Sequence, residues 1–372
     1  MKLRQLVLAT AVAAAGLSSA LVPSVATAQA KEQFFPLLVY RTGAYAPNGT
    51  PWANGKQDYI KMINARDGGI NGVKLTFEEC ETGYATDKGV ECYERLKGKT
   101  NTLFDPQATG ITFALTDKVP NDKIPLITLG YGLSASQDGG VFKWNFPLMG
   151  SYWTAADILI QHIGKKEGGM DKLKGKKIVH LYHDSAYGKE PLPVLEAEAA
   201  KWGFELIKIP ITPPGSEQQS QWLQIRQANP DYVIMWTFGV MSAVGLKTAQ
   251  RNGFPREKIL GVWWAGSEED TEPAGEAAKG FSTMSFTTPG EFPILDEIRT
   301  KLYKNGQGNL KELDRVGNVM YMRGIAAAVM MVESMRNAQN KFGKGKTPAD
   351  PKTLPYAAQL AALVVDSLNS PL

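Results

Sequence analysis

Short apolar runs alternate with amphipathic stretches along most of this chain. The runs are rich in Ile, Val and Trp and do not alternate with polar residues, as expected for parallel strands covered on both faces. After residue 150 they predict strands at Ile178–Tyr182, Phe204–Ile209, Tyr232–Thr237 and Ile259–Trp264. Helices are predicted around and between them: Ser151–His162, a helix that ends at Gly203, one around Trp222, and Met241–Asn252. Gly just past a helix end is an expected stop signal.

The stretch from Arg41 to Cys80 shows the same alternation in the first half. A short apolar strand at Leu37–Tyr40 leads into a Gly/Pro/Asn-rich loop, an amphipathic helix, a turn at residues 68–72 and a return strand. Strand, loop, helix and strand make one βαβ unit. The loop follows the carboxyl end of the first strand, which is where open α/β sheets bind small molecules.

Further strands are predicted near Val73, Thr102 and Leu126, separated by helical stretches. One sheet ends and a second begins on either side of Trp144–Pro147, so we expect this segment to pass between two lobes. The predicted fold class is α/β, with two lobes that are each a mostly parallel, doubly wound sheet and a ligand cleft between them.

Taken together, the opening βαβ unit and the paired βα lobes resemble the periplasmic solute-binding proteins of the branched-chain amino acid transporter type, from about Phe34 to Phe342. The resemblance implies that the chain crosses back near Phe281–Phe286 and that the Ala/Met-rich helix Val316–Asn337 returns to the first lobe. The implied domains are a signal at 1–30, lobe 1 at 31–145 and 286–345, lobe 2 at 146–285, and an atypical tail at 346–372. Family members usually extend the second lobe there, whereas this tail is proline-rich and then apolar.

Met1–Ala30 has the pattern of a secretory signal: Lys2 and Arg4, then an apolar run too short to span a bilayer, then small residues. Cleavage after Ala28 or after Ala30 is equally defensible, and no Cys follows that would carry a lipid anchor. We therefore expect a protein exported to the periplasm.

Without that segment the chain has 39 basic and 37 acidic residues. Such a balance argues against a nucleic-acid surface. The roughly 340 remaining residues are enough for two domains. No further segment is long and apolar enough to cross a membrane.

Cys80 and Cys92 are the only cysteines of the chain. An even count in an exported chain favours a disulfide between them, and the helix that carries Cys92 folds back toward the strand that ends at Cys80. The alternative is two separate buried thiols. A zinc site would need two more ligands nearby, and none are evident.

A helix is predicted from Ile111, preceded by Gln107, Ala108, Thr109 and Gly110. Its free backbone N–H groups and the Thr109 hydroxyl favour a carboxylate as guest. The resemblance implies the same role, since a Ser or Thr here holds the ligand's carboxylate in the family. A plain N-cap is the competing interpretation of Thr109.

Gly130, Tyr131 and Gly132 follow the strand near Leu126, and their spacing with Ala135 matches a dinucleotide fingerprint. That fingerprint needs a helix directly after the loop, and residues 138–140 interrupt it. The resemblance instead implies that ligand-binding main chain lies here. Gly-Tyr-Gly departs from the usual family loop, so Tyr131 either stacks on a ligand or narrows the pocket.

The second lobe supplies three further candidates. Residues 183–188 resemble the family's D-x-x-Y-G loop, which implies that Tyr187 faces the ligand; the alternative is a Tyr that packs only at a strand end. Phe238 ends the next strand, and Glu268 is placed to meet an ammonium group or to lie in a solvated acidic turn. Tyr45 and Trp52 are expected on the opening loop, exposed and within reach of the cleft, which favours a planar ligand.

Catalytic signals are few. His180 and His183 point to opposite faces of a strand, so they form no chelate, and no G-x-S-x-G motif occurs.

We expect a monomeric solute-binding protein of an ABC importer, without enzymatic activity or cofactor. Its ligand would be an amino acid or a small carboxylate, aromatic ones included, and its partners the membrane permease and ATPase subunits. The alternatives are a nicotinamide-dependent oxidoreductase that uses the Gly130 loop and a ligand-sensing module of the same fold.

Overall fold

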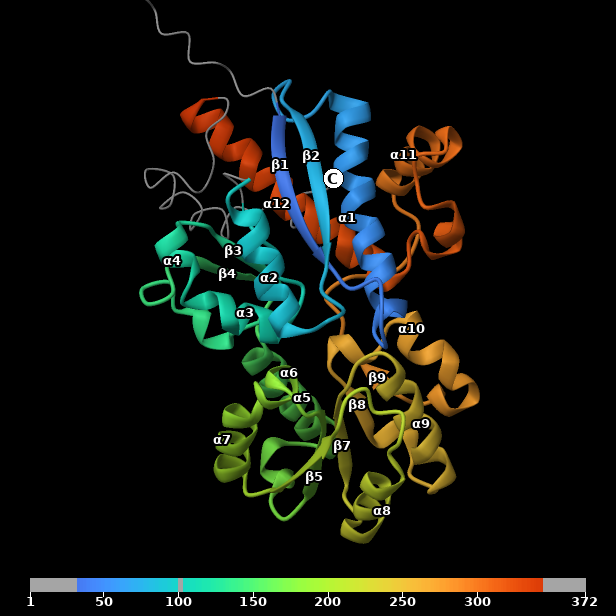
Figure 1. Cartoon of the computed structure of the whole chain (residues 1–372). Coiled ribbons are helices and arrows are strands. Elements are labelled where there is room, and N and C mark those ends of the chain that lie inside the picture. Colours follow the sequence, from blue (N-terminus) through green and yellow to red (C-terminus); the bar gives the residue numbers. More distant parts are fainter. Residues whose placement is uncertain (1–31, 100–102, 344–372) are drawn as a thin grey trace, which may run out of the picture. The chain divides into compact units, whose positions relative to one another are not determined.

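The structure is a computed structural model that describes residues 32–99 and 103–343. All strands of this part belong to sheets with parallel pairing (Figure 1). The strands are β1 (Glu32–Val39), β2 (Lys74–Glu81), β3 (Leu126–Leu129), β4 (Asn145–Leu148), β5 (Lys177–His183), β6 (Glu205–Ile211), β7 (Tyr232–Trp236), β8 (Ile259–Gly261) and β9 (Ser282–Thr283). The helices up to residue 202 are α1 (Ala46–Asp67), α2 (Thr86–Lys97), α3 (Thr109–Thr116), α4 (Val119–Asp122), α5 (Tyr152–Glu167), α6 (Ala186–Lys189) and α7 (Leu192–Trp202). The later ones are α8 (Gln219–Ala228), α9 (Val240–Arg251), α10 (Glu268–Thr271), α11 (Pro293–Lys301) and α12 (Val319–Phe342).

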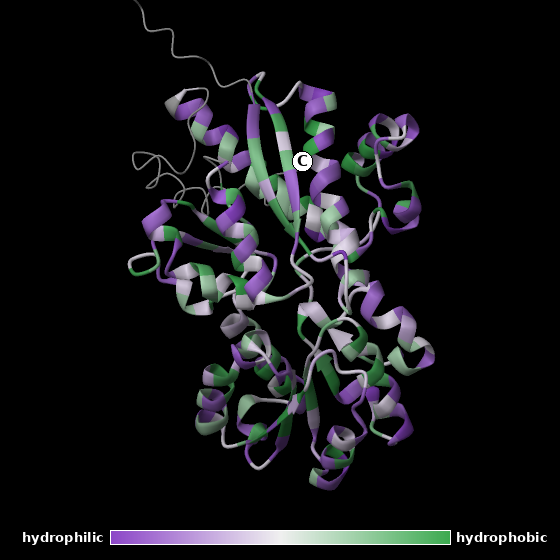
Figure 2. Cartoon of the chain, viewed as in Figure 1, coloured by the Kyte–Doolittle hydropathy of each residue, from purple (hydrophilic) through white to green (hydrophobic). Residues whose placement is uncertain are grey.

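The second half of the chain forms one five-stranded sheet in the order β6-β5-β7-β8-β9. The central strand β7 is apolar along its whole length, and in Figure 2 the middle strands are mostly green while the surrounding helices show purple outer faces. Strand β7 is buried at all five positions. Burial on both faces is what parallel strands between helical layers require, so the predicted α/β class with parallel sheets is confirmed.

The first half pairs β1 with β2 and β3 with β4, and Phe104 bridges to Leu126. Because β4 begins at Asn145, the segment expected to pass between lobes is itself a strand paired with β3. The strand expected near Thr102 falls on undescribed residues, beside the single bridge at Phe104.

The last helix, α12, packs on α1 at the start of the chain (Figure 1). Two glycines allow this close approach: a Cβ on Gly55 would lie 2.2 Å from the carbonyl oxygen of Tyr321, and one on Gly324 would lie 2.1 Å from that of Trp52. Asp58 of α1 also accepts a hydrogen bond of 2.8 Å from the Tyr321 hydroxyl. Helix α1 contacts β1 and β2, and α12 contacts β3, so the two packed helices connect the two strand pairs of the first half.

Helix α1 begins earlier than the sequence pattern predicts and absorbs most of the expected opening loop. Pro47 lies in its first turn, where a missing N–H costs nothing. Gly49, which favours a loop in the sequence, is here used for packing: a Cβ on it would lie 2.0 Å from the Tyr40 carbonyl oxygen. Close contact, and not turn formation, explains this glycine.

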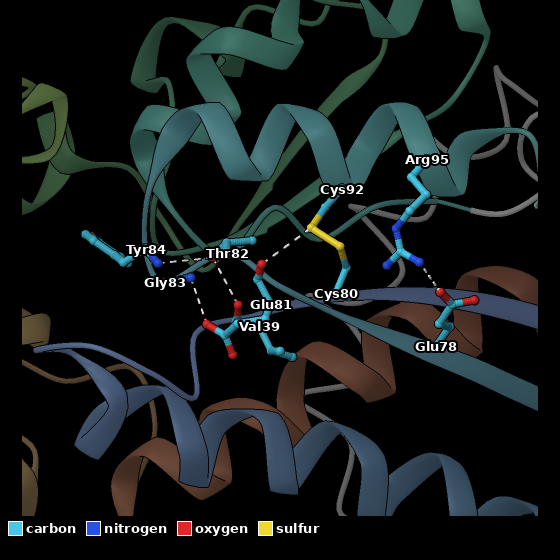
Figure 3. The surroundings of a disulfide bond; sticks show 9 residues. All are labelled: Val39, Glu78, Cys80, Glu81, Thr82, Gly83, Tyr84, Cys92 and Arg95. Carbon is cyan, nitrogen blue, oxygen red and sulfur yellow. Dashed lines mark hydrogen bonds and ion pairs between the residues drawn. A yellow bond between two sulfur atoms is a disulfide. The ribbon is translucent and has the colours of Figure 1, made fainter.

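The predicted disulfide between Cys80 and Cys92 is confirmed, with a Cα–Cα distance of 5.7 Å (Figure 3). It joins the end of β2 to the middle of α2 and closes a loop that contains Tyr84. The same loop is ordered by Thr82, whose hydroxyl donates to the Val39 carbonyl oxygen at 3.0 Å and accepts from the Tyr84 N–H at 3.1 Å.

The expected signal at 1–30 and the tail at 346–372 lie outside the described residues. Within the described ranges, none of the helices combines the length and the apolar character needed to span a membrane.

Candidate functional site

Eleven side chains line a small cavity at the carboxyl ends of strands from both halves of the chain. Eight of them are aromatic, and the space between them is about 10 Å³, room for a single water molecule. The lining residues are Tyr40, Trp52, Tyr84, Gln107, Ala108, Thr109, Tyr131, Tyr152, Tyr187, Phe238 and Trp264. None of these eleven carries a carboxylate, ammonium, guanidinium or imidazole group.

The aromatic walls pack on one another. Trp52 of α1 stacks on Trp264, with ring centroids 5.0 Å apart and planes 17° apart. Tyr40 meets the edge of Trp52 at 6.3 Å, and Tyr152 at the start of α5 lies 5.4 Å from Tyr187 of α6. A ligand therefore enters only if these rings separate or move.

A buried ion pair lies behind one wall. Lys56 Nζ is 2.9 Å from Asp105 Oδ2 and 3.0 Å from Gln107 Oε1. The Tyr131 hydroxyl donates to Asp105 and accepts from the Gln107 backbone N–H at 2.7 Å. Burial, and next the Asp105 charge, hold the pKa of Tyr131 well above its usual range. Lys56 and Asp105 thus satisfy each other and offer no net charge to the cavity.

Three buried polar atoms on lining residues have no partner among the described residues. They are the Tyr40 hydroxyl, the Trp52 Nε1–H and the Gln107 Nε2 amide. The orientation of the Gln107 amide is fixed, because its oxygen accepts from Lys56 and its nitrogen must be the free end. A buried polar group without a partner costs free energy, so these atoms favour an acceptor placed in the cavity.

Asp270 lies beyond the lining residues, on the β8 side of the cavity. Its carboxylate accepts from the Gly239 N–H at 2.6 Å and from the N–H and hydroxyl of Ser267 at 3.0 and 2.6 Å. Burial raises its pKa to about 7 despite these donors. Three of its about four acceptor positions are therefore occupied by these groups.

Arg323 of α12 is fully buried beside Trp264. Its guanidinium carbon lies 4.5 Å from the Trp264 ring centroid and 4.9 Å from that of Phe286. In the described part of the chain its hydrogen bonds go to the Trp263 carbonyl oxygen, at 2.6 Å, and to the Met320 sulfur, and none to a carboxylate; its Nε has no partner. Burial lowers its pKa to about 10.

Hydrogen bonds hold the two sides of the cavity together. The hydroxyl of Tyr45, which follows β1, lies 2.7 Å from His183 Nε2 at the end of β5. The Gly130 carbonyl oxygen, after β3, accepts from Trp263 Nε1 at 2.7 Å and from Trp264 Nε1 at 3.0 Å. Two more hydrogen bonds join the two sides: Asn48 Nδ2 donates to Ser267 Oγ at 3.3 Å, and the Ser134 N–H donates to Glu190 Oε1 at 2.7 Å.

Half of the residues predicted as ligand contacts line the cavity. These are Trp52, Thr109, Tyr131, Tyr187 and Phe238. Thr109 is the first residue of α3, and its hydroxyl accepts from the Gly132 N–H at 3.3 Å without capping the helix. Tyr187 donates to the Thr237 carbonyl oxygen at 3.0 Å, so its hydroxyl already has a partner.

The other predicted residues lie outside the lining. Tyr45 stacks on the lining residue Phe238, with ring centroids 5.5 Å apart, and does not itself line the cavity. Gly110, Gly130 and Gly132 are not among the lining residues either. Glu268 Oε2 instead accepts from the Val319 N–H at 3.0 Å, at the start of α12. A carboxylate favours a helix N-terminus because free N–H groups lie there. In this structure Glu268 therefore contacts α12 and does not line the cavity.

The expectation that Tyr45 and Trp52 are exposed on a loop is wrong. They are 7% and 2% exposed, Tyr45 at the start of α1 and Trp52 inside it. Sequence reasoning missed Tyr40, Tyr84, Tyr152 and Trp264, although Tyr40 and Trp264 end predicted strands, where cleft residues are expected.

The dinucleotide interpretation of the Gly130 loop lacks its helix. A 3₁₀ turn of four residues, Ser134–Gln137, follows the loop. His180 and His183 are directed apart as expected: His180 Nε2 lies 2.9 Å from the Gly188 carbonyl oxygen, and His183 contacts Tyr45. Over residues 32–99 and 103–343, His, Cys, Asp and Glu nowhere gather in threes that would suit a metal.

Comparison with known proteins places this geometry in a family. The model of the periplasmic binding protein family matches residues 32–371. A solved structure named as an ABC transporter permease from the Pseudomonas fluorescens group is 44% identical, with 89% of this chain and 84% of that chain covered and a TM-score of 0.76. No curated protein sequence gives a significant match.

Two more distant structures share the fold. A fatty acid ABC transporter substrate-binding protein from Thermomonospora curvata is 22% identical, covering 88% of this chain and 80% of that one, with a TM-score of 0.72. A branched-chain amino acid ABC transporter from Thermus thermophilus with bound valine is also 22% identical, covering 88% and 83%, with a TM-score of 0.72. The two-lobed fold of type I periplasmic binding proteins, expected from the sequence, is thereby confirmed. The chain belongs to the periplasmic binding protein family.

Proposed function

We propose that this protein is an extracytoplasmic solute-binding protein of an ABC importer, acting in the periplasm as a monomer. It would capture an amino acid or a small carboxylate, aromatic ones included, and deliver it to a membrane permease with its ATPase subunits. The observation that carries the proposal is the aromatic cavity with three unpaired buried donors, built from strand ends of both halves in a chain of this family.

Opening and closing of the two sides is the proposed mechanism. A cavity of about 10 Å³ is too small for any amino acid, and the bonds of Tyr45 to His183 and of Gly130 to Trp263 hold it shut. Ligand entry would break these bonds by a hinge motion. Closure over the ligand would bring the two sides together again with the rings of Trp52 and Trp264 moved apart to make room for it. The lobes that move are proposed to be 31–145 with 286–345, and 146–285. The closed form is the one a permease would recognise.

Residues of both sides would hold the ligand. Thr109 and the free N–H groups at the start of α3 would bind a carboxylate, because helix N-termini favour anions. Tyr187 and Phe238 would cover it from the β5–β9 side. No step of this mechanism breaks a covalent bond, so we propose a protein that is not an enzyme.

A thermal-shift and calorimetric screen tests the proposal. The panel contains amino acids, aliphatic and aromatic acids, amides, urea, polyamines and sugars. At least one compound is expected to bind one-to-one and to raise the melting temperature, since a ligand at 100 times its Kd adds about 2.7 kcal/mol of stability. A panel without any binder would contradict the proposal.

Two threonines of α3 provide a matched pair of variants. Thr109 lines the cavity, whereas Thr112 is buried three residues later and donates to the Ala108 carbonyl oxygen at 2.9 Å. T109V is expected to weaken binding of the ligand found in the screen, and T112V is expected to leave its affinity unchanged. Equal effects of the two variants would argue against a ligand contact at Thr109.

A further inference from the structure

The cavity differs from what an amino acid requires. An amino acid carries both a carboxylate and an ammonium group, and a buried ammonium needs an acceptor or a carboxylate beside it. Asp105 is already paired with Lys56 and Tyr131, and Asp270 already accepts from Gly239 and Ser267. Glu268 is occupied at the start of α12. The lining therefore offers an ammonium group no carboxylate, and these three acids already have partners.

The groups that do lack partners point to a ligand that accepts hydrogen bonds. The Trp52 Nε1–H and the Gln107 amide nitrogen can only donate, and the Tyr40 hydroxyl can donate as well. A carboxylate, with two oxygens and about four acceptor positions, matches three donors better than any neutral acceptor does.

A buried cation lies directly behind the aromatic wall. Arg323 lies against Trp264, a lining ring, and in the described part of the chain it has no carboxylate hydrogen-bonded to it; Asp270 acts on it only through its charge. A guanidinium one ring away from the cavity attracts an anion through a low-dielectric medium and repels a cation. The aromatic rings alone would suit a cation, but Trp264 already has the guanidinium over its ring.

We propose that this cavity selects a small carboxylate with an apolar body and no ammonium group. Tyr40, Trp52 and Gln107 donate hydrogen bonds to the carboxylate beside the Thr109 hydroxyl, which makes four donors for its about four acceptor positions. The aromatic side chains move apart to enclose the apolar body, and Arg323 supplies the counter-charge from behind Trp264. This inference rests on the proposed function and narrows its ligand class.

Pairs of probes that differ only in the ammonium group test the inference. They are 3-phenylpropanoate against phenylalanine, 4-methylpentanoate against leucine, and propanoate against alanine, with benzoate and benzamide as a pair that differs in charge. At least one carboxylate is expected to bind at least about tenfold more tightly than its amino acid partner, and benzoate more tightly than benzamide.

The outcomes separate this inference from the proposed function. Amino acids that bind as tightly as their partners, or a best ligand that lacks a carboxylate, overturn the inference and leave the solute-binding function intact. If no compound of the wider screen binds, both the inference and the proposed function are refuted.

Single-atom variants test the assigned donors. Y40F is expected to weaken binding of the tightest carboxylate by about tenfold or more, while the unliganded protein keeps or gains stability because an unpaired buried hydroxyl is removed. Y93F is the control: Tyr93 donates to Asp122 at 2.8 Å, away from the cavity, so its loss should lower the melting temperature without changing affinity. Unchanged affinity of Y40F would overturn the role of Tyr40.

Two further variants complete the test. W52F removes the donor at the cavity, and W222F removes an equally unpaired indole N–H in the core of the five-stranded sheet. Only W52F is expected to weaken binding. Q107E keeps an oxygen for Lys56 and replaces the free donor by an acceptor, so carboxylates should bind much more weakly. An increase in carboxylate affinity for Q107E would contradict the arrangement.

Discussion

Removing the disulfide should cost this protein about 3 kcal/mol of stability. Cys80 and Cys92 are 12 residues apart, and closing a loop of that length in the unfolded chain removes about 3 kcal/mol of conformational entropy at 25 °C. Both cysteines are buried, so alanine is the replacement that leaves no unpaired polar group. The change is the double variant C80A/C92A, measured by urea unfolding at neutral pH.

The same loop carries Tyr84, which lines the cavity. Without the disulfide, Tyr84 should be less restricted, so the double variant is also expected to bind ligand more weakly. Hydrogen exchange should speed up first at residues 81–92, because the constraint is local.

A nearby ion pair serves as the control for the disulfide prediction. Arg95 and Glu78 are 2.6 Å apart but 47% and 33% exposed (Figure 3). Exposed pairs contribute ~0–1 kcal/mol, so R95M should change stability by less than a third of the disulfide effect. Equal losses in R95M and C80A/C92A, or a loss below about 1 kcal/mol in the latter, would refute the entropy reasoning.

Three other changes give distinct signatures. G324A forces a Cβ to 2.1 Å from the Trp52 carbonyl oxygen and should cost about 1–3 kcal/mol, read as a lower melting temperature. K56M leaves Asp105 buried without its partner and should cost about 3–5 kcal/mol in denaturant unfolding. Burial lowers the pKa of His183 to about 4, so its stabilising effect is present above pH 6.5 and lost as pH falls toward 4; H183Q should make stability fall less steeply over that range, by up to about 1.4 kcal/mol per pH unit. An unchanged slope in H183Q would contradict the assignment.

The alternation of apolar runs and amphipathic helices was sufficient to predict the parallel sheets. Gly203, for example, ends α7 in the left-handed conformation, as the stop signal predicts. The pattern failed where glycine serves packing. Gly49 and Gly55 look like loop residues, yet they lie inside α1 because Tyr40 and α12 approach them closely.

The candidate site was only partly accessible from the sequence. Thr109 and Tyr187 follow from their places at strand ends and from the resemblance. The place of Arg323 could not be predicted. This cation of α12 follows Trp264 by more than fifty residues in the sequence, and only the tertiary contact with that ring brings it near the cavity. The contact of Glu268 with α12 could not be predicted, because nothing in its neighbourhood in the sequence reveals the start of that helix.

Native mass spectrometry of the protein as purified tests the central claim most directly. We expect a one-to-one complex with a small organic acid, either carried through purification or formed when the tightest probe is added, and a lower fraction bound in W52F than in W222F. A protein that shows no adduct with any compound of the screen, or binding that is equal in the two variants, would contradict a ligand site at this cavity.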